Sequence, residues 1–110
     1  MIDLNALKAL FDDDVLVRKY INRFVEDMPG LLHTMRKASE DQKWDDLSIH
    51  AHSYKSQMQY INEADAADIA TALEKLSGAP DPDAEKIENL LLRLEAHLTK
   101  LLPALKQINV

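Results

Sequence analysis

Residues 44–62 read WDDLSIHAHSYKSQMQYIN, and the spacing of their apolar side chains decides how this part of the chain folds. Apolar residues recur there every three or four positions, which is the pattern of a helix with one buried face. These positions are Leu47, Ala51, Tyr54, Met58 and Ile61. The pattern predicts an amphipathic helix from Trp44 to Asn62, with these five side chains forming its core stripe.

Polar side chains form a strip on the flank of this helix that lies away from the apolar stripe. At an advance of about 100° per residue, the strip consists of Ser48, His52, Lys55, Ser56 and Gln59. Within it, His52 and Lys55 are three residues apart, so their side chains can converge on one anion. An exposed imidazole beside a mobile cation, with no pocket around it, suits a group that another protein must reach.

Two helices are expected before this one. A short helix should run from Ile2 to about Phe11 with Asp3 as its N-cap. The acidic residues 12–14 should then open a long helix, because carboxylates are favoured at a helix N-terminus. The expected core stripe of the long helix is Val17, Tyr20, Phe24, Met28, Leu31 and Met35.

Two further helices are expected after it. The first should run from about Ala64 to Leu76, and its expected core residues are Ala66, Ile69, Ala70, Leu73 and Leu76. Residues 77–80 form the strongest break in the chain, and Asp81 followed by Pro82 reads as an N-cap with proline at the first helical position. The last helix carries Ile87, Leu91, Leu94, Leu98, Leu101, Leu105 and Ile108. Their alternating spacing of four and three is typical of a helix in a bundle.

Prolines fall within two of the expected helices. Pro29 and Gly30 interrupt the long helix that begins after residues 12–14, and proline tends to kink a helix or end it. The segment is therefore either one kinked helix or two helices, and the apolar spacing favours one because it continues without a phase shift. In the last helix, Pro103 predicts a late kink or an early end.

The number and length of these helices predict the fold class. Four substantial helices with short connections predict an all-α fold, an antiparallel up-down-up-down four-helix bundle with a short N-terminal cap helix. The chain has 110 residues, which is enough for one core, so we expect residues 1–110 to form a single domain.

Composition excludes several classes of function. There are 13 Lys and Arg against 19 Asp and Glu, and the net charge of −6 argues against nucleic acid or an anionic membrane surface as the main partner. The chain has no cysteine, and its two glycines do not form a Gly-rich phosphate loop. No apolar run approaches the roughly 20 residues of a membrane span, and the acidic start is no signal peptide. We therefore expect a cytoplasmic domain.

The four histidines do not form a metal site. A di-metal site in a bundle needs Glu-x-x-His pairs, but none of His33, His50, His52 and His97 has a glutamate three residues before it. Two of them, His50 and His52, are two residues apart, so they diverge on a helix and cannot chelate one ion. A metal-binding bundle is therefore disfavoured, and His50, at the edge of the core stripe, is interpreted as structural.

The segment Ala51-His52-Ser53-Tyr54-Lys55-Ser56, on the second long helix of a small acidic bundle, resembles the histidine phosphotransfer (HPt) domain of two-component phosphorelays. The family pattern is roughly Ala-His-x-Leu-Lys-Gly. The resemblance covers essentially the whole chain and includes the Met28-Pro29-Gly30 break and the Trp44-Asp45 pair. His-x-x-Lys alone is a weak motif, and its specificity comes from its position within this layout.

The resemblance implies a role for three residues. His52 would be the phosphoacceptor and Lys55 would stabilise the phosphoryl group. The family also places a Gln or Glu twenty-two residues after the histidine, and here that residue is Glu74, which would orient the imidazole. The expected partner-binding residues are Ser48, Ala51, Ser56 and Gln59, with a contribution from the short helix at residues 2–10.

The implied function is a phosphorelay intermediate that takes a phosphoryl group from a receiver-domain aspartate and passes it to another receiver. No ATP-binding pattern is visible, so we expect a phosphocarrier without autokinase activity. It would need no cofactor of its own, since Mg²⁺ is expected on the receiver partner. The expected partners are response-regulator receiver domains or a hybrid sensor kinase, and the protein itself would be a monomer.

Four positions depart from the family pattern. Tyr54 replaces leucine, Ser56 replaces glycine, and Asn62 stands where a glycine is usual, although asparagine tolerates the left-handed conformation better than most residues. The fourth, Gln59, replaces a small residue on the same flank as His52, where it would shield the phosphoryl group, select partners or obstruct docking. It favours an alternative function, a helical-bundle adaptor (pseudo-HPt) that binds a receiver or kinase without carrying phosphate.

Overall fold

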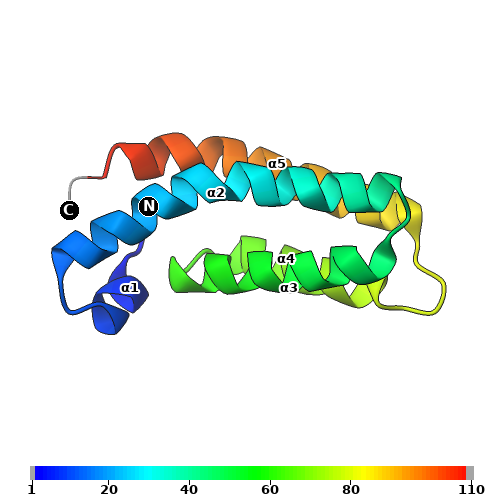
Figure 1. The fold of residues 1–110 in the computed structure, drawn as a ribbon, viewed down its shortest axis with the longest axis horizontal. Helices are drawn as coiled ribbons and strands as arrows, with labels where there is room; N and C mark the ends of the chain where they lie inside the picture. Colours follow the sequence, from blue (N-terminus) through cyan, green and yellow to red (C-terminus); the bar gives the residue numbers. More distant parts are fainter. Residues whose placement is uncertain (1, 109–110) are drawn as a thin grey trace.

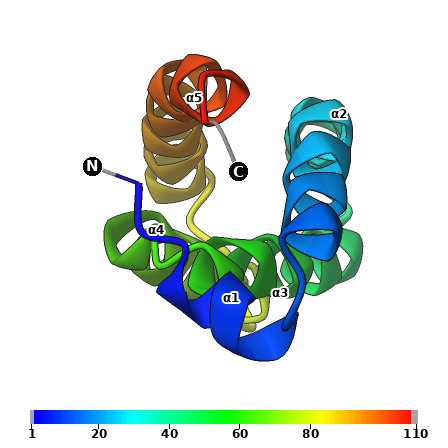
Figure 2. The same cartoon turned by 90° about the vertical axis from the view of Figure 1, so that its left-hand side faces the viewer.

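The structure, a computed structural model, describes residues 2–108. Its helices are α1 (Asn5–Leu10), α2 (Asp14–Glu40), α3 (Trp44–Tyr60), α4 (Ala64–Ser77) and α5 (Ala84–Lys106). The four long helices lie side by side and alternate in direction, and α1 covers the end of the bundle where α2 begins (Figures 1 and 2). The prediction of an all-α, up-down-up-down bundle with a short cap helix is confirmed.

The long helix α2 begins at an acidic cap, as expected. The carboxylate of Asp13 accepts a hydrogen bond from the backbone N–H of Val15 at 2.8 Å. The helix then continues through Pro29 to Glu40, so the interpretation as one helix is confirmed and the two-helix alternative is wrong.

The core stripe of α2 differs from the prediction at two neighbouring pairs of residues. Ile21 and Leu32 are buried, whereas Tyr20 and Leu31 are only half-buried and pack against the edge of the core. Spacings of three and four both keep residues on one helix face, so the sequence pattern fits either member of each pair. The buried residues of α2 are Val17, Ile21, Phe24, Met28, Leu32, Met35 and Ala38.

All five core residues predicted for this segment are buried, each at most 1% exposed, four of them in α3 and Ile61 as the residue that follows it. Helix α3 ends at Tyr60, two residues earlier than predicted, because Asn62 adopts the left-handed conformation with φ of 55°. At this end the N–H of Glu63 donates to the carbonyl of Met58 at 2.9 Å. The expectation that Asn62 permits a left-handed helix end is confirmed.

The predicted caps of α1 and α5 are wrong in position. Helix α5 is capped by Asp83, whose carboxylate accepts from the N–H of Lys86 at 3.1 Å, and Asp81 lies in the preceding loop. Helix α1 starts at Asn5, later than expected, although the carboxylate of Asp3 still accepts from the Asn5 N–H at 2.9 Å. In each region several acidic residues stand close together, so the sequence alone does not select the one that caps.

The ends of α4 and α5 lie close to the predicted ones. Helix α4 extends one residue further than expected, to Ser77. Helix α5 continues through Pro103 to Lys106, so the early end is wrong and Ile108, though half-buried, lies beyond the helix.

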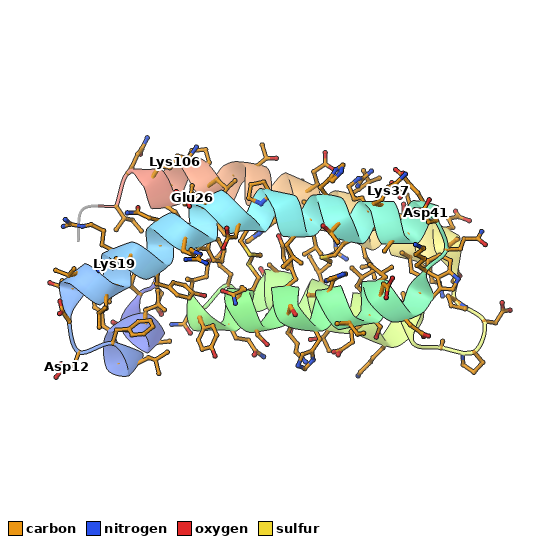
Figure 3. The ribbon with its side chains drawn as sticks, in the orientation of Figure 1. Asp12, Lys19, Glu26, Lys37, Asp41 and Lys106 are labelled. Carbon is orange, nitrogen blue, oxygen red and sulfur yellow. The ribbon has the colours of Figure 1, made fainter. Side chains whose placement is uncertain are left out.

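The outer surface of the bundle is charged. Lys19, Glu26 and Lys106 are exposed, and their side chains project outward from α2 and α5 (Figure 3). At the other end of the bundle, Lys37 and Asp41 pair at 3.8 Å. None of the helices in residues 2–108 combines the length and apolarity that crossing a membrane requires.

Candidate functional site

The imidazole of His52 lies on the outer side of α3, and 59% of the side chain is exposed. The helix places it there because Ala51, beside it, points into the core with no exposed surface. The Nδ1 atom lies 2.8 Å from Oε2 of Glu74 on α4. An ionised carboxylate can only accept a hydrogen bond, so Nδ1 carries a proton, and in the neutral form of the ring the lone pair is then on Nε2. The geometry thus holds the exposed imidazole in one tautomer.

Glu74 joins His52 to Lys55. Its second oxygen, Oε1, accepts a hydrogen bond from Nζ of Lys55 at 3.3 Å, and both side chains are largely buried, with 26% and 20% of their surface exposed. Burial alone would raise the pKa of the Glu74 carboxyl, but the hydrogen bonds from Lys55 and His52 outweigh burial and hold that pKa below its ordinary value. Glu74 is therefore an anion at neutral pH and keeps its role as acceptor.

Lys55 was expected to stabilise the phosphoryl group on His52, whereas in the structure it contacts Glu74. Its ammonium group pairs with the carboxylate that holds Nδ1, so in this structure the cation balances the charge of Glu74. Lys55 thus stabilises the anionic form of the residue that orients the imidazole.

The remaining predicted residues fall into three environments. Ser56 is half-buried and donates from its hydroxyl to the carbonyl of His52 at 3.2 Å, whereas Gln59 is exposed. Ser48 is also half-buried, and its hydroxyl donates to the backbone carbonyl of Glu74 at 3.2 Å. Ala51 is completely buried, so the expectation that it contacts a partner is wrong. The sequence also placed Ala51 in the core stripe, and a single methyl group that packs in the core cannot also contact a partner on the outer face.

A second histidine–glutamate pair was not anticipated from the sequence. Nε2 of His97 on α5 lies 2.7 Å from Oε1 of Glu63, and these side chains are only 23% and 20% exposed. The two residues are 34 positions apart and belong to no motif, so no sequence signal brings them together. Their burial distinguishes them from His52, whose imidazole another protein can reach. His50 is half-buried, in agreement with a structural role.

Comparison with known proteins identifies the family of this chain. A family model described as "Hpt domain" matches residues 19–107, which covers α3, α4 and α5 completely and α2 from its second turn. Its range includes His52, Lys55 and Glu74 and leaves out α1. The searches of curated proteins and of solved structures gave no significant match.

Proposed function

The chain belongs to the Hpt-domain family, which acts in phosphotransfer in two-component relays, and we propose that it carries the phosphoryl group on His52. One observation carries the proposal: the exposed imidazole donates its Nδ1 proton to the ionised Glu74 and leaves Nε2 free. The nucleophile in such a transfer must be a neutral imidazole with an accessible lone pair. The exposure of His52 and its contact with Glu74 support this assignment.

The proposed transfer is a displacement at phosphorus. The lone pair of Nε2 attacks the phosphoryl group of a receiver's aspartyl phosphate, the N–P bond forms, and the bond between phosphorus and the aspartate oxygen breaks. The aspartate leaves as a carboxylate, and the proton on Nδ1 stays hydrogen-bonded to Glu74 throughout. The phosphorylated ring carries its charge next to that carboxylate, which orients it as the acidic residue of a catalytic triad orients its histidine. Transfer to a second receiver is the reverse of these steps.

Lys55 would act in two stages. Before transfer it neutralises Glu74, as its 3.3 Å contact supports. After transfer the new phosphoryl group offers Lys55 a second anion, and the flexible lysine side chain can reorient toward it. Phosphoryl transfer depends mainly on positioning and on charge neutralisation, and Lys55 would contribute the second of these.

The partners follow from family membership. Hpt domains interact with response-regulator receiver domains and are in general phosphocarriers without catalytic activity. For this chain we propose that the receiver supplies the aspartate and its Mg²⁺, that the carrier has no autokinase activity, and that Ser56 and Gln59 lie at the centre of the docking surface. A hybrid sensor kinase that contains a receiver domain would fit the same surface.

A second function remains open because of Gln59. This side chain is exposed on the same flank of α3 as His52, where the family usually has a small residue. An obstructed approach to Nε2 would leave an adaptor that binds a receiver or kinase without accepting phosphate.

The two functions are separated by a labelling experiment. Purified wild-type protein is incubated with receiver domains that carry a radioactive phosphoryl group, and the acid-labile, base-stable label on it is measured. His52→Gln should abolish the label and leave thermal stability nearly unchanged, because an exposed side chain contributes little to packing. His50→Gln, two residues away on the same helix, is the matched control and should keep it.

Two outcomes would contradict the proposal. Label that persists in His52→Gln and vanishes in His50→Gln would move the acceptor to the other histidine. Wild-type protein that binds a phosphorylated receiver but never takes up label would favour the adaptor.

A further inference from the structure

Three side chains on one face of α3 contact Glu74, two at its carboxylate and one at its backbone carbonyl. Ser48, His52 and Lys55 occupy positions i, i+4 and i+7, which share one face of a helix. His52 and Lys55 contact the carboxylate, whereas the hydroxyl of Ser48 donates to the backbone carbonyl of the same residue at 3.2 Å. The residue that orients the imidazole is thus itself fixed to the helix that carries the imidazole.

The other donors to this carbonyl are local to the end of α4. The N–H of Gly78 donates to it at 3.1 Å, and the hydroxyl of Ser77 donates to it at 3.2 Å. These contacts span three or four residues, so they shape the last turn of α4 but do not place it relative to α3. Ser48 is 26 residues away in sequence, and its contact is the one that ties the backbone at Glu74 to α3.

Gly78 lies next to this contact. A Cβ at Gly78 would lie 3.3 Å from the Glu74 carbonyl oxygen and 3.6 Å from the hydroxyl oxygen of Ser48. The first distance is tighter than ordinary van der Waals contact, so a side chain there would require the carbonyl to shift by a few tenths of an ångström. The backbone of Gly78 has φ of −85°, which any residue adopts, so the glycine is not required for its conformation.

We propose that Ser48 is a positioning residue that acts through Glu74. By holding the carbonyl of Glu74, it fixes the Cα atom from which the carboxylate extends toward Nδ1 of His52. Its hydroxyl donates within the α3–α4 interface, and this role is separate from the docking contact expected of Ser48. The consequence for phosphotransfer rests on the proposed function, whereas the consequence for the imidazole tautomer does not.

The test is made on the free protein, so a role of Ser48 in docking does not affect it. The ¹⁵N chemical shifts of the His52 ring are measured at a pH where the imidazole is neutral, because they distinguish the protonated nitrogen from the unprotonated one. In wild type we expect the proton on Nδ1. In Ser48→Ala the Nε2-protonated form should become populated, since a misplaced carboxylate no longer selects one tautomer.

Two further variants separate positioning from general damage. Ser48→Thr keeps a hydroxyl at the same place and should restore the wild-type tautomer. Ser53→Ala is the matched control, because it removes a hydroxyl of the same helix that donates to the carbonyl of Ile49, at 3.4 Å, within α3 itself. It should leave the ring signals of His52 unchanged.

The rate of phosphoryl transfer from a labelled receiver gives the second measurement. The loss of one neutral hydrogen bond should slow transfer by about two- to tenfold in Ser48→Ala, with recovery in Ser48→Thr. Wild-type tautomer populations in Ser48→Ala would overturn the inference. So would a tautomer change that Ser48→Thr fails to reverse. If no receiver labels the wild-type protein, the proposed function fails, but the ring signals still decide the role of Ser48.

Discussion

At the scale of single residues, the orientation of the imidazole depends on the carboxylate of Glu74 and on the cation of Lys55 that pairs with it. One carboxylate oxygen of Glu74 lies against Nδ1 of His52, and the ammonium group of Lys55 contacts the other. Glu74 therefore orients the imidazole, while Lys55 balances the charge of Glu74. Removal of either charge should change the chemistry at Nε2 although neither group touches that atom.

The first prediction concerns Lys55. Lys55→Ala should slow transfer to His52 and shorten the lifetime of the phosphohistidine, because the charge partner is lost while the nucleophile remains. A preorganised electrostatic group in a closed site is worth a factor of 10² to 10³, so at this open site we expect roughly three- to thirtyfold. Rapid-quench kinetics and the decay of isolated phosphoprotein measure the two effects. An unchanged rate and lifetime would show that the lysine is only a solvated charge.

The second prediction is the pH dependence that Glu74 gives to stability. The folded protein holds the pKa of this carboxyl below its ordinary value of 4.5. The unfolded chain therefore binds the proton more readily, and the stabilisation is present above pH 4.5 and lost as the pH falls through the lowered folded-state pKa. Urea unfolding of wild type and Glu74→Gln should differ most above pH 4.5 and converge in acid. A difference that grows as the pH falls would contradict this sign.

At the scale of the helices, the ends are fixed by single backbone conformations. Asn62 ends α3 with φ of 55°, and Gln42 follows α2 with φ of 56°. After α3 the chain turns at once: the backbone N–H of Glu63 donates to the carbonyl of Met58, and the side chain of Glu63 pairs with His97 on α5. The end of α3 thus sets where α4 begins and, through α4, where Glu74 lies.

The third prediction tests this helix end. Asn62→Gly should leave the free energy of unfolding unchanged or raise it slightly, because glycine adopts positive φ without strain. Asn62→Val should lower it by about 1–2 kcal/mol, the cost of the left-handed conformation for a residue with a branched Cβ. Asn89→Val, at an exposed position inside α5, is the control and should change little, since asparagine and valine have similar helix propensities. Equal losses in both valine variants would contradict the account.

How well the sequence predicts the structure differs from one helix to the next. The buried residues of α3 follow from their spacing alone, because a single stripe fits all of them. In α2 the same logic leaves a choice between Leu31 and Leu32, and only the packing of neighbouring helices decides it. The caps could not be selected either, because Asp81 and Asp83 are equally good candidates until the backbone is known.

The contacts within the site could likewise be predicted only in part from the sequence. The pairing of His52 with Glu74 was expected only through the family resemblance, because residues 22 apart on different helices share no periodicity. The contact of Ser48 with the Glu74 carbonyl was not expected at all. It depends on how α3 and α4 are shifted relative to each other, and apolar patterns do not encode that shift.

At the scale of the whole molecule, the bundle presents α3 and α4 together on one side, with α2 and α5 opposite (Figure 2). A receiver that brings its aspartate in line with Nε2 must therefore approach the α3 side. The proposed footprint is centred on Ser56 and Gln59 and extends toward α1, which covers one end of the bundle. A carrier must release each partner, so we expect a transient complex that buries less than roughly 1,200 Å².

The fourth prediction concerns this surface. If Gln59 obstructs or selects partners, Gln59→Ala should speed transfer or broaden the range of receivers that transfer phosphate. If Gln59 shields the phosphohistidine, the variant should lose phosphate faster. Lys100→Ala, at an exposed position on α5, is the control and should behave as wild type. Chemical-shift perturbation by a receiver maps the footprint independently, and changes confined to α5 would contradict the docking model.

The central claim, that the free Nε2 of His52 receives the phosphoryl group, can be tested most directly by nitrogen-resolved NMR. Protein labelled with ¹⁵N is mixed with a phosphorylated receiver, and the ring nitrogens of His52 are observed before and after transfer. The account predicts that Nε2 shifts and couples to ³¹P while Nδ1 keeps its proton, held by Glu74. Phosphorus coupled to Nδ1 of His52, or to a nitrogen of His50, would contradict it.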